Sequence, residues 1–105
     1  MVFNTGSALL DAIVLAIVSK EPEGTYGYNL TQEVRKAIEV SESTLYPVLR
    51  RLQKDGCLET YDMEFAGRNR RYYKITDTGR AQLRLYMDEW VIYYKKINNI
   101  FEGVK

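Results

Sequence analysis

Apolar residues recur along most of the chain with the spacing of helices. The most apolar stretch predicts a first helix over Ser7–Ser19, buried on nearly all sides, with Ser7 or Thr5 as its N-cap. A second helix is predicted to begin near Tyr28, and its inward positions are Leu30, Val34, Ala37 and Ile38. A long final helix is predicted to open at Thr76.

A third predicted helix, between an N-cap at Ser41 and a terminating Gly56, contains a proline. Its apolar face is formed by Leu45, Val48, Leu49 and Leu52. Pro47 lies on the opposite face, where the backbone carbonyl that it leaves without a partner can be hydrated. The outward positions are Ser43, Pro47, Arg50 and Lys54, flanked by Tyr46 and Arg51. We therefore expect this face to meet solvent or a ligand, not the core.

Alternation of residue types replaces helical spacing after the third helix. Residues 57–65 predict a strand, residues 66–69 a turn and residues 70–75 a returning strand. On the returning strand, one face carries Arg70, Tyr72 and Lys74, and the other carries Arg71, Tyr73 and Ile75. Three helices followed by a hairpin are the layout of a winged helix–turn–helix. The expected fold class is mainly α with a small β-hairpin.

The final helix carries apolar residues on two sides. Spacings of three and four alternate along a stripe of Leu83, Met87, Trp90, Tyr94, Ile97 and Phe101. Leu85 and Ile92 lie on nearly the opposite side. We expect this helix to pack against its copy in a homodimer. The alternative is a helix folded back over its own core with Leu85 and Ile92 exposed. The expected division is a winged helix–turn–helix over residues 1–78 and a dimerisation helix over residues 79–105.

The residue inventory argues against an enzyme. The chain of 105 residues has no histidine and one cysteine, Cys57, so no catalytic constellation, metal site or cofactor is expected. A lone cysteine allows no intramolecular disulfide and favours a reduced, cytoplasmic setting. The apolar segment Ala8–Val18 is too short to cross a bilayer, so no membrane partner is expected.

Charge is unevenly distributed although the net charge is only +1. Residues 50–84 carry nine Lys or Arg against five Asp or Glu, whereas residues 1–49 carry three against six. Basic residues on the third helix and on the hairpin are explained together by contacts with phosphates of double-stranded DNA. The candidate DNA-binding residues are Ser43, Thr44, Tyr46, Pro47, Arg50, Arg51, Lys54, Arg68, Arg70 and Lys74. The alternative is a protein-interaction module whose basic face meets an acidic partner.

Three motifs carry a family resemblance. The segments TYGYNLTQEV, SESTLYPVLRRLQKDG and GRNRRYYKITDTGRAQL resemble, in this order, motifs of the PadR family of bacterial transcriptional regulators. The resemblance covers about residues 8–84 and implies a winged-helix DNA-binding homodimer, usually a repressor of nearby genes.

On matching positions, the resemblance assigns Tyr46 and Pro47 to the recognition helix and Arg68 and Arg70 to the wing. The chain departs from the family pattern at Glu42 and Ser43, where many members of the family have a residue followed by glycine before the threonine. These residues lie near the expected DNA face. The operator sequence of relatives is therefore not transferred to this chain.

The final helix resembles that of multidrug-sensing PadR-like repressors. In that branch, a tryptophan on this helix helps to line a pocket between subunits that accepts flat aromatic compounds. Trp90 matches the position, and its expected neighbours are Tyr93, Tyr94, Met87 and Ile97. A ligand stacked there would change the distance between the two recognition helices and weaken operator binding. The alternative is that Trp90 only fills the dimer core.

Overall fold

The computed structural model describes residues 6–105, and its first helix matches the prediction. Helix α1 spans Ser7–Ser19, and no residue from Ala8 to Ser19 is exposed. Gly6 is the N-cap and provides no side-chain hydrogen bond. The prediction of Ser7 as N-cap was therefore wrong, because Ser7 already lies inside the helix. The other candidate, Thr5, lies outside the described residues.

Helix α2 is shorter than its apolar pattern predicted. It spans Gly27–Arg35 and buries Leu30, Thr31 and Val34. Ala37 and Ile38 follow the helix end, where Ala37 is exposed and Ile38 half-buried. The two residues continue the apolar spacing in sequence, but the backbone has already turned toward the next helix.

Helix α3 spans Glu42–Lys54 and has the predicted cap and faces. The Ser41 hydroxyl accepts a hydrogen bond from the Thr44 backbone N–H at 3.2 Å, which satisfies one free donor at the helix start. Leu45, Leu49 and Leu52 are buried, and Val48 is half-buried. Pro47 is exposed, so the missing N–H and the crowded carbonyl lie on the hydrated side.

The hairpin forms a three-stranded antiparallel sheet with a short strand that was not predicted. Strand β2 spans Leu58–Phe65, β3 spans Arg68–Ile75, and β1, of two residues, spans Thr25–Tyr26. The strand order is β1-β3-β2, so β3 is central. A two-residue turn joins β2 to β3, with positive φ at Ala66 and Gly67. Strand β3 begins two residues earlier than expected, at Arg68.

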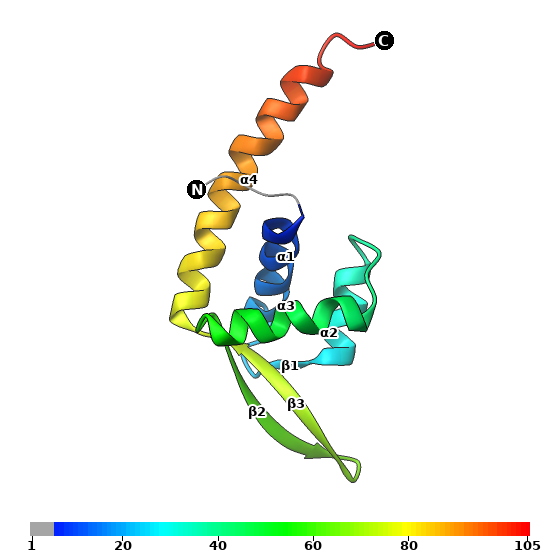
Figure 1. The fold of residues 1–105 in the computed structure, drawn as a ribbon, viewed down its shortest axis with the longest axis vertical. Helices are drawn as coiled ribbons and strands as arrows, with labels where there is room; N and C mark the ends of the chain where they lie inside the picture. Colours follow the sequence, from blue (N-terminus) through cyan, green and yellow to red (C-terminus); the bar gives the residue numbers. More distant parts are fainter. Residues whose placement is uncertain (1–5) are drawn as a thin grey trace.

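Helix α4 spans Asp77–Phe101, and only its first part packs on the rest of the chain (Figure 1). The Thr76 hydroxyl accepts from the Gly79 N–H at 3.0 Å and caps the helix, as predicted. Leu83 and Tyr86 pack against the core next to α1. Toward its C-terminus the helix extends away from the other elements, and its exposed large apolar residues are Leu85, Met87, Trp90, Val91, Ile92, Tyr94, Ile100 and Phe101.

One apolar core joins the three-helix unit to the base of the sheet. It consists of Val14, Leu15, Val18, Leu30, Val34, Leu45, Leu49, Leu52, Cys57, Leu58 and Tyr73. Four helices and a small antiparallel sheet agree with the predicted winged helix–turn–helix class. Among residues 6–105, no helix has the combination of length and apolarity needed to cross a membrane.

Candidate nucleic-acid interface and apolar groove

The outer face of α3 presents polar and basic side chains to solvent. Ser43, Thr44, Pro47, Arg50 and Lys54 are all exposed. The leucines on the opposite side hold the helix against the core, so this outer face is fixed in orientation. The arrangement agrees with the expected recognition helix of a winged helix–turn–helix, which places a polar face in the major groove.

Tyr46 stands at the edge of this face and touches the start of α2. Its hydroxyl donates to Glu42 Oε2 at 3.4 Å. A Cβ added to Gly27 would lie 3.3 Å from the Tyr46 ring, so the absence of a side chain at Gly27 allows this close approach. Burial, assisted by the charge of Glu42, raises the pKa of Tyr46. The phenol therefore stays protonated and can donate to a phosphate oxygen or a base.

The register of the hairpin separates the basic residues of the wing onto two faces. Arg68, Arg70 and Lys74 pair with Phe65, Met63 and Glu59, and these six side chains share one face. The other face carries Arg71, which pairs with Asp62, and Tyr73, which is buried in the core. The face that carries Arg71 is therefore the one turned toward the helices.

Arg71 was not predicted to contact DNA, and it pairs across the strands with Asp62. That pairing exists, since Arg71 Nε lies 3.5 Å from Asp62 Oδ1 in an exposed ion pair. Burial raises the pKa of Tyr73, and the charges of Arg71 and Arg50 oppose this shift. Tyr73 lies two residues from Arg71 on the same face of β3 and packs in the core with Leu45 and Leu49 of α3. Arg71 thus lies on the same side of the sheet as α3. In the sequence, Arg71 lies two residues before Tyr73 and therefore on the same face of the strand. This spacing indicates the position of Arg71 only together with the burial of Tyr73.

Arg70 and Lys74, two predicted DNA contacts of the wing, pack against other residues of the chain. The Arg70 guanidinium lies between the rings of Tyr26 and Phe65, with its carbon 4.4 Å from each centroid. Lys74 packs beside the turn that precedes β1, because a Cβ at Gly24 would lie 3.0 Å from Lys74 Cγ. Lys74 thus shares its sheet face with Arg68 and Arg70 but lies at the other end of β3, beside the turn at Gly24.

Arg51, also a predicted DNA contact, is bound to a buried carboxylate. Its Nη2 lies 2.5 Å from Asp11 Oδ1 and its Nη1 lies 3.0 Å from Asp11 Oδ2. The hydrogen bonds with Asp11 raise the pKa of Arg51. The guanidinium is thus directed into the protein toward α1, whereas the neighbouring Arg50 is exposed.

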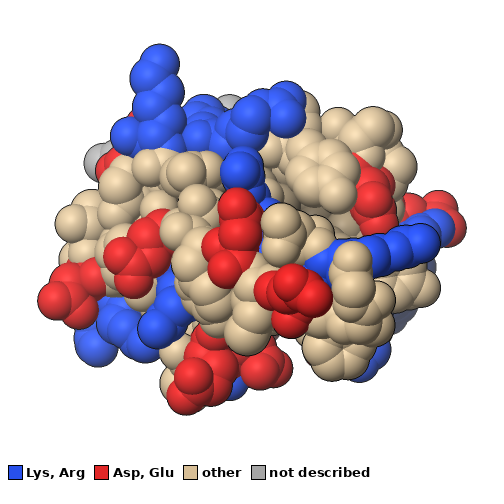
Figure 2. Space-filling model, turned by 90° about the horizontal axis from the view of Figure 1, so that it is seen from below, with Lys and Arg blue, Asp and Glu red and all other residues tan. Residues whose placement is uncertain are grey.

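A hollow of about 190 Å³ lies where the wing, the start of α2 and α3 meet. It is lined by Tyr26, Gly27, Tyr28, Tyr46, Arg70, Arg71 and Tyr73. Tyrosine hydroxyls and guanidinium groups are the donors that contact DNA phosphates. Seen from the wing end, Lys and Arg lie mainly around the edge of the molecule, with Asp and Glu between them (Figure 2). The charge of this surface is mixed, not uniformly basic.

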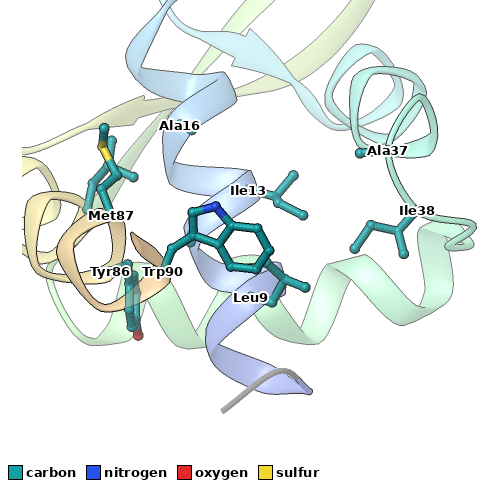
Figure 3. A pocket seen from close by; sticks show the side chains of 10 residues that line it. Leu9, Ile13, Ala16, Ala37, Ile38, Tyr86, Met87 and Trp90 are labelled. Atoms are coloured by element: carbon teal, nitrogen blue, oxygen red, sulfur yellow. The ribbon is translucent and has the colours of Figure 1, made fainter. Parts of the chain in front are cut away.

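A second feature is an apolar groove between α1, α4 and the segment after α2. Its volume is about 460 Å³, and it is lined by Leu9, Ala12, Ile13, Ala16, Ala37, Ile38, Leu83, Tyr86, Met87 and Trp90. Figure 3 shows the Trp90 indole reaching from α4 across toward Leu9 and Ile13 of α1. Among the described residues near it there is no cluster of His, Cys, Asp or Glu that could hold a metal ion.

The groove includes part of the predicted ligand set. Met87 and Trp90 line it, whereas Tyr93, Tyr94 and Ile97 do not. Tyr94 stacks on Trp90 with centroids 6.2 Å apart, and the Tyr93 ring lies at 6.0 Å. The stripe on α4 could not reveal the α1 side of the groove, because those residues are far away in the sequence.

Comparisons with known proteins agree with this geometry. Residues 14–85 match the model of the family described as "Transcriptional regulator PadR-like family". The transcriptional regulator Rv3488 of Mycobacterium tuberculosis is 48% identical over 59 residues, which cover 55% of each chain.

Solved structures extend the similarity to nearly the whole chain. The structure of smu.1704 from Streptococcus mutans is 41% identical with a TM-score of 0.86, covering 98% of this chain and 95% of that one. A PadR-like transcriptional regulator from Bacillus cereus is 33% identical with a TM-score of 0.83, covering 94% and 97%. The matched family consists of transcriptional regulators, which confirms the prediction that the protein is not an enzyme. The chain belongs to the PadR-like family of DNA-binding transcriptional regulators.

Proposed function

We propose that this regulator is a homodimeric repressor acting in the bacterial cytoplasm. Residues 1–78 bind one half of an inverted repeat, and residues 79–105 hold two copies together. The observation that carries the proposal is the outer face of α3, where Arg50 and Lys54 are exposed opposite a leucine-packed core face. Such a helix can enter the major groove without unfolding any part of the chain.

The proposed DNA contacts come from both α3 and the wing. They are Ser43, Thr44, Tyr46, Pro47, Arg50, Lys54, Arg68, Arg70 and Arg71. Arg51 is omitted because its guanidinium is bound to Asp11, and Lys74 is omitted because it packs beside the turn at Gly24. The exposed tip residue Arg68 is the proposed backbone or minor-groove contact of the wing.

The experiment that tests DNA recognition is a gel-shift titration. The DNA upstream of the protein's own gene is compared with a shuffled fragment at about 50 and about 200 mM salt, a range over which phosphate-driven binding weakens steeply. We expect a preference for the native fragment that persists at the higher concentration. Equal and salt-sensitive binding to both fragments would contradict specific recognition of the protein's own upstream DNA and leave the protein-interaction alternative.

The dimer is supported by the exposed apolar surface of α4. Ile100 and Phe101 are 69% and 65% exposed, and they end a stripe that begins near the core with Leu83. A symmetric pairing of two α4 helices would bury this stripe against itself. Burial of large apolar side chains is the main favourable term in protein association.

A second proposed function is release of DNA by a flat aromatic ligand. It is supported by the groove at Trp90, whose volume of about 460 Å³ falls within the range of small-molecule sites. Trp90 is the one tryptophan of the chain, so tryptophan fluorescence, excited selectively over that of the nine tyrosines, reports on the groove. We expect planar cationic dyes to quench this fluorescence with saturation. If no dye in a panel of such compounds quenched the fluorescence with saturation, the proposed binding of a flat aromatic ligand at Trp90 would be contradicted.

A further inference from the structure

Three helices meet at one buried carboxylate. Asp11 of α1 is 3% exposed and lies within the core side of the helix. It accepts two hydrogen bonds from Arg51 of α3, at 2.5 and 3.0 Å. The Tyr86 hydroxyl of α4 also lies 3.2 Å from Asp11 Oδ2 and donates to it. These contacts join residues separated by 40 and 75 positions in the sequence.

The geometry makes the placement of α3 and α4 interdependent. A buried carboxylate is strongly destabilising unless it is paired, and Arg51 and Tyr86 supply the donors that pair with Asp11. The two parallel hydrogen bonds from Arg51 fix the direction of the guanidinium as well as its distance. Burial, together with the charge of Asp11, raises the pKa of Tyr86, so its phenol remains a hydrogen-bond donor at neutral pH.

The two donors belong to the helices that the proposed function uses. Arg51 follows Arg50, a proposed base contact, along α3, and Tyr86 belongs to the helix that is proposed to pair the two copies. A dimer binds an inverted repeat only when its recognition helices are about one DNA turn apart, ~34 Å. That distance depends on the angle at which α3 is held relative to α4 in each copy.

We propose that Asp11, Arg51 and Tyr86 are positioning residues that set the half-site spacing accepted by the dimer. The proposal rests on the proposed function of a dimer on an inverted repeat. It assigns Arg51 an indirect role in DNA recognition in place of a direct contact. The Asp11 carboxylate holds α3 through its hydrogen bonds with Arg51 and α4 through its hydrogen bond with Tyr86, so the positions of the two helices are linked.

The test uses Tyr86→Phe, which removes one hydroxyl and keeps the ring that packs against the core. Binding is measured on the operator found by gel shift and on variants with one base pair more or fewer between the half-sites. We expect the wild type to prefer the native spacing by about tenfold or more, and Tyr86→Phe to reduce this preference below about threefold. Arg51→Lys, which keeps the charge and loses the paired hydrogen bonds, should change the preference in the same direction.

Matched controls separate positioning from general damage. Thr78→Ala removes an exposed hydroxyl from the first turn of the same helix, outside the apolar stripe, and should leave the spacing preference unchanged. Thermal unfolding and oligomeric state are measured for every variant. Tyr86→Phe should remain a dimer, and its thermal stability should fall by no more than the loss of one hydrogen bond explains. A folded Tyr86→Phe dimer with wild-type spacing preference would overturn the inference while the proposed function stands. A wild type without fragment preference would overturn both.

Discussion

Arg50 and Arg51 are adjacent and carry the same charge, but their surroundings differ. Arg50 is exposed on the outer face of α3, whereas Arg51 pairs with a carboxylate whose side chain is 4% exposed. Arg51→Ala leaves that carboxylate without its main partner. We expect a loss of about 3 kcal/mol in the free energy of unfolding, the low end for a buried pair because Arg51 itself is 44% exposed.

Arg50→Ala is the matched substitution at the neighbouring position. We expect it to lower operator affinity by about fivefold or more, because one arginine contact to a base is worth about 1–3 kcal/mol, and to leave stability unchanged. Gel-shift titration and denaturant unfolding of both variants measure the two quantities. The assignment of roles would be wrong if Arg50→Ala unfolded the protein or left DNA affinity intact.

Cys57 is a second residue whose surroundings determine its chemistry. It is 5% exposed in the core, and burial raises the pKa of its thiol. A raised pKa keeps the unreactive protonated thiol dominant at pH 8. In the unfolded chain, where the pKa of cysteine is about 8.5, part of the thiol is ionised at this pH. We expect alkylation by iodoacetamide at pH 8 to be slow in buffer and fast in denaturant. Equal rates in both conditions would contradict the burial of Cys57.

At the scale of elements, the junction between the hairpin and α4 depends on Gly79. A Cβ at this position would lie 2.1 Å from the Cys57 carbonyl oxygen and 2.8 Å from Ile75 Cγ1. Alanine favours a helix over glycine by about 1 kcal/mol, but a clash with backbone outweighs this gain. We expect Gly79→Ala to destabilise the protein by about 2 kcal/mol in denaturant unfolding.

Thr78→Ala provides the control for the Gly79 substitution. Thr78 is exposed in the same first turn, so alanine there gains helix propensity without meeting another element. Its stability should equal or exceed that of the wild type. If Gly79→Ala were as stable as Thr78→Ala, the close approach of α4 to residue 57 would not exist in solution.

The sequence predicted elements better than it predicted which faces meet. The bounds of α1 and the caps of α3 and α4 follow from apolar periodicity and from Ser41 and Thr76, which are local signals. Strand β1, with two residues, is too short to show alternation. Alternation along β3 showed that Arg71 and Lys74 lie on opposite faces, but not which face meets α3, because that depends on the burial of Tyr73.

At the scale of the whole molecule, a monomer leaves the outer part of α4 without a packing partner. Ile100→Glu combined with Phe101→Glu places charges on this surface without touching the core. We expect the wild type to be a dimer by light scattering at micromolar concentration and the variant to be a monomer with the same helical content. Loss of the second half-site contact should weaken operator binding by about 100-fold.

Lys95→Glu is the control for charge on the same helix, because Lys95 is exposed and lies outside the apolar stripe. It should leave both the oligomeric state and the operator affinity close to those of the wild type. A double variant that remained dimeric would show that α4 does not pair the copies through its C-terminal end.

The mixed charge of the wing-end surface has a consequence for how the regulator finds its site. Acidic side chains lie between basic ones on that surface, and the whole chain has a net charge of only +1 (Figure 2). Binding to unrelated DNA is driven mainly by release of counterions, so a surface of mixed sign gains little from it. We therefore expect the free protein to bind unrelated DNA weakly. Few copies should then be held on unrelated genomic sites.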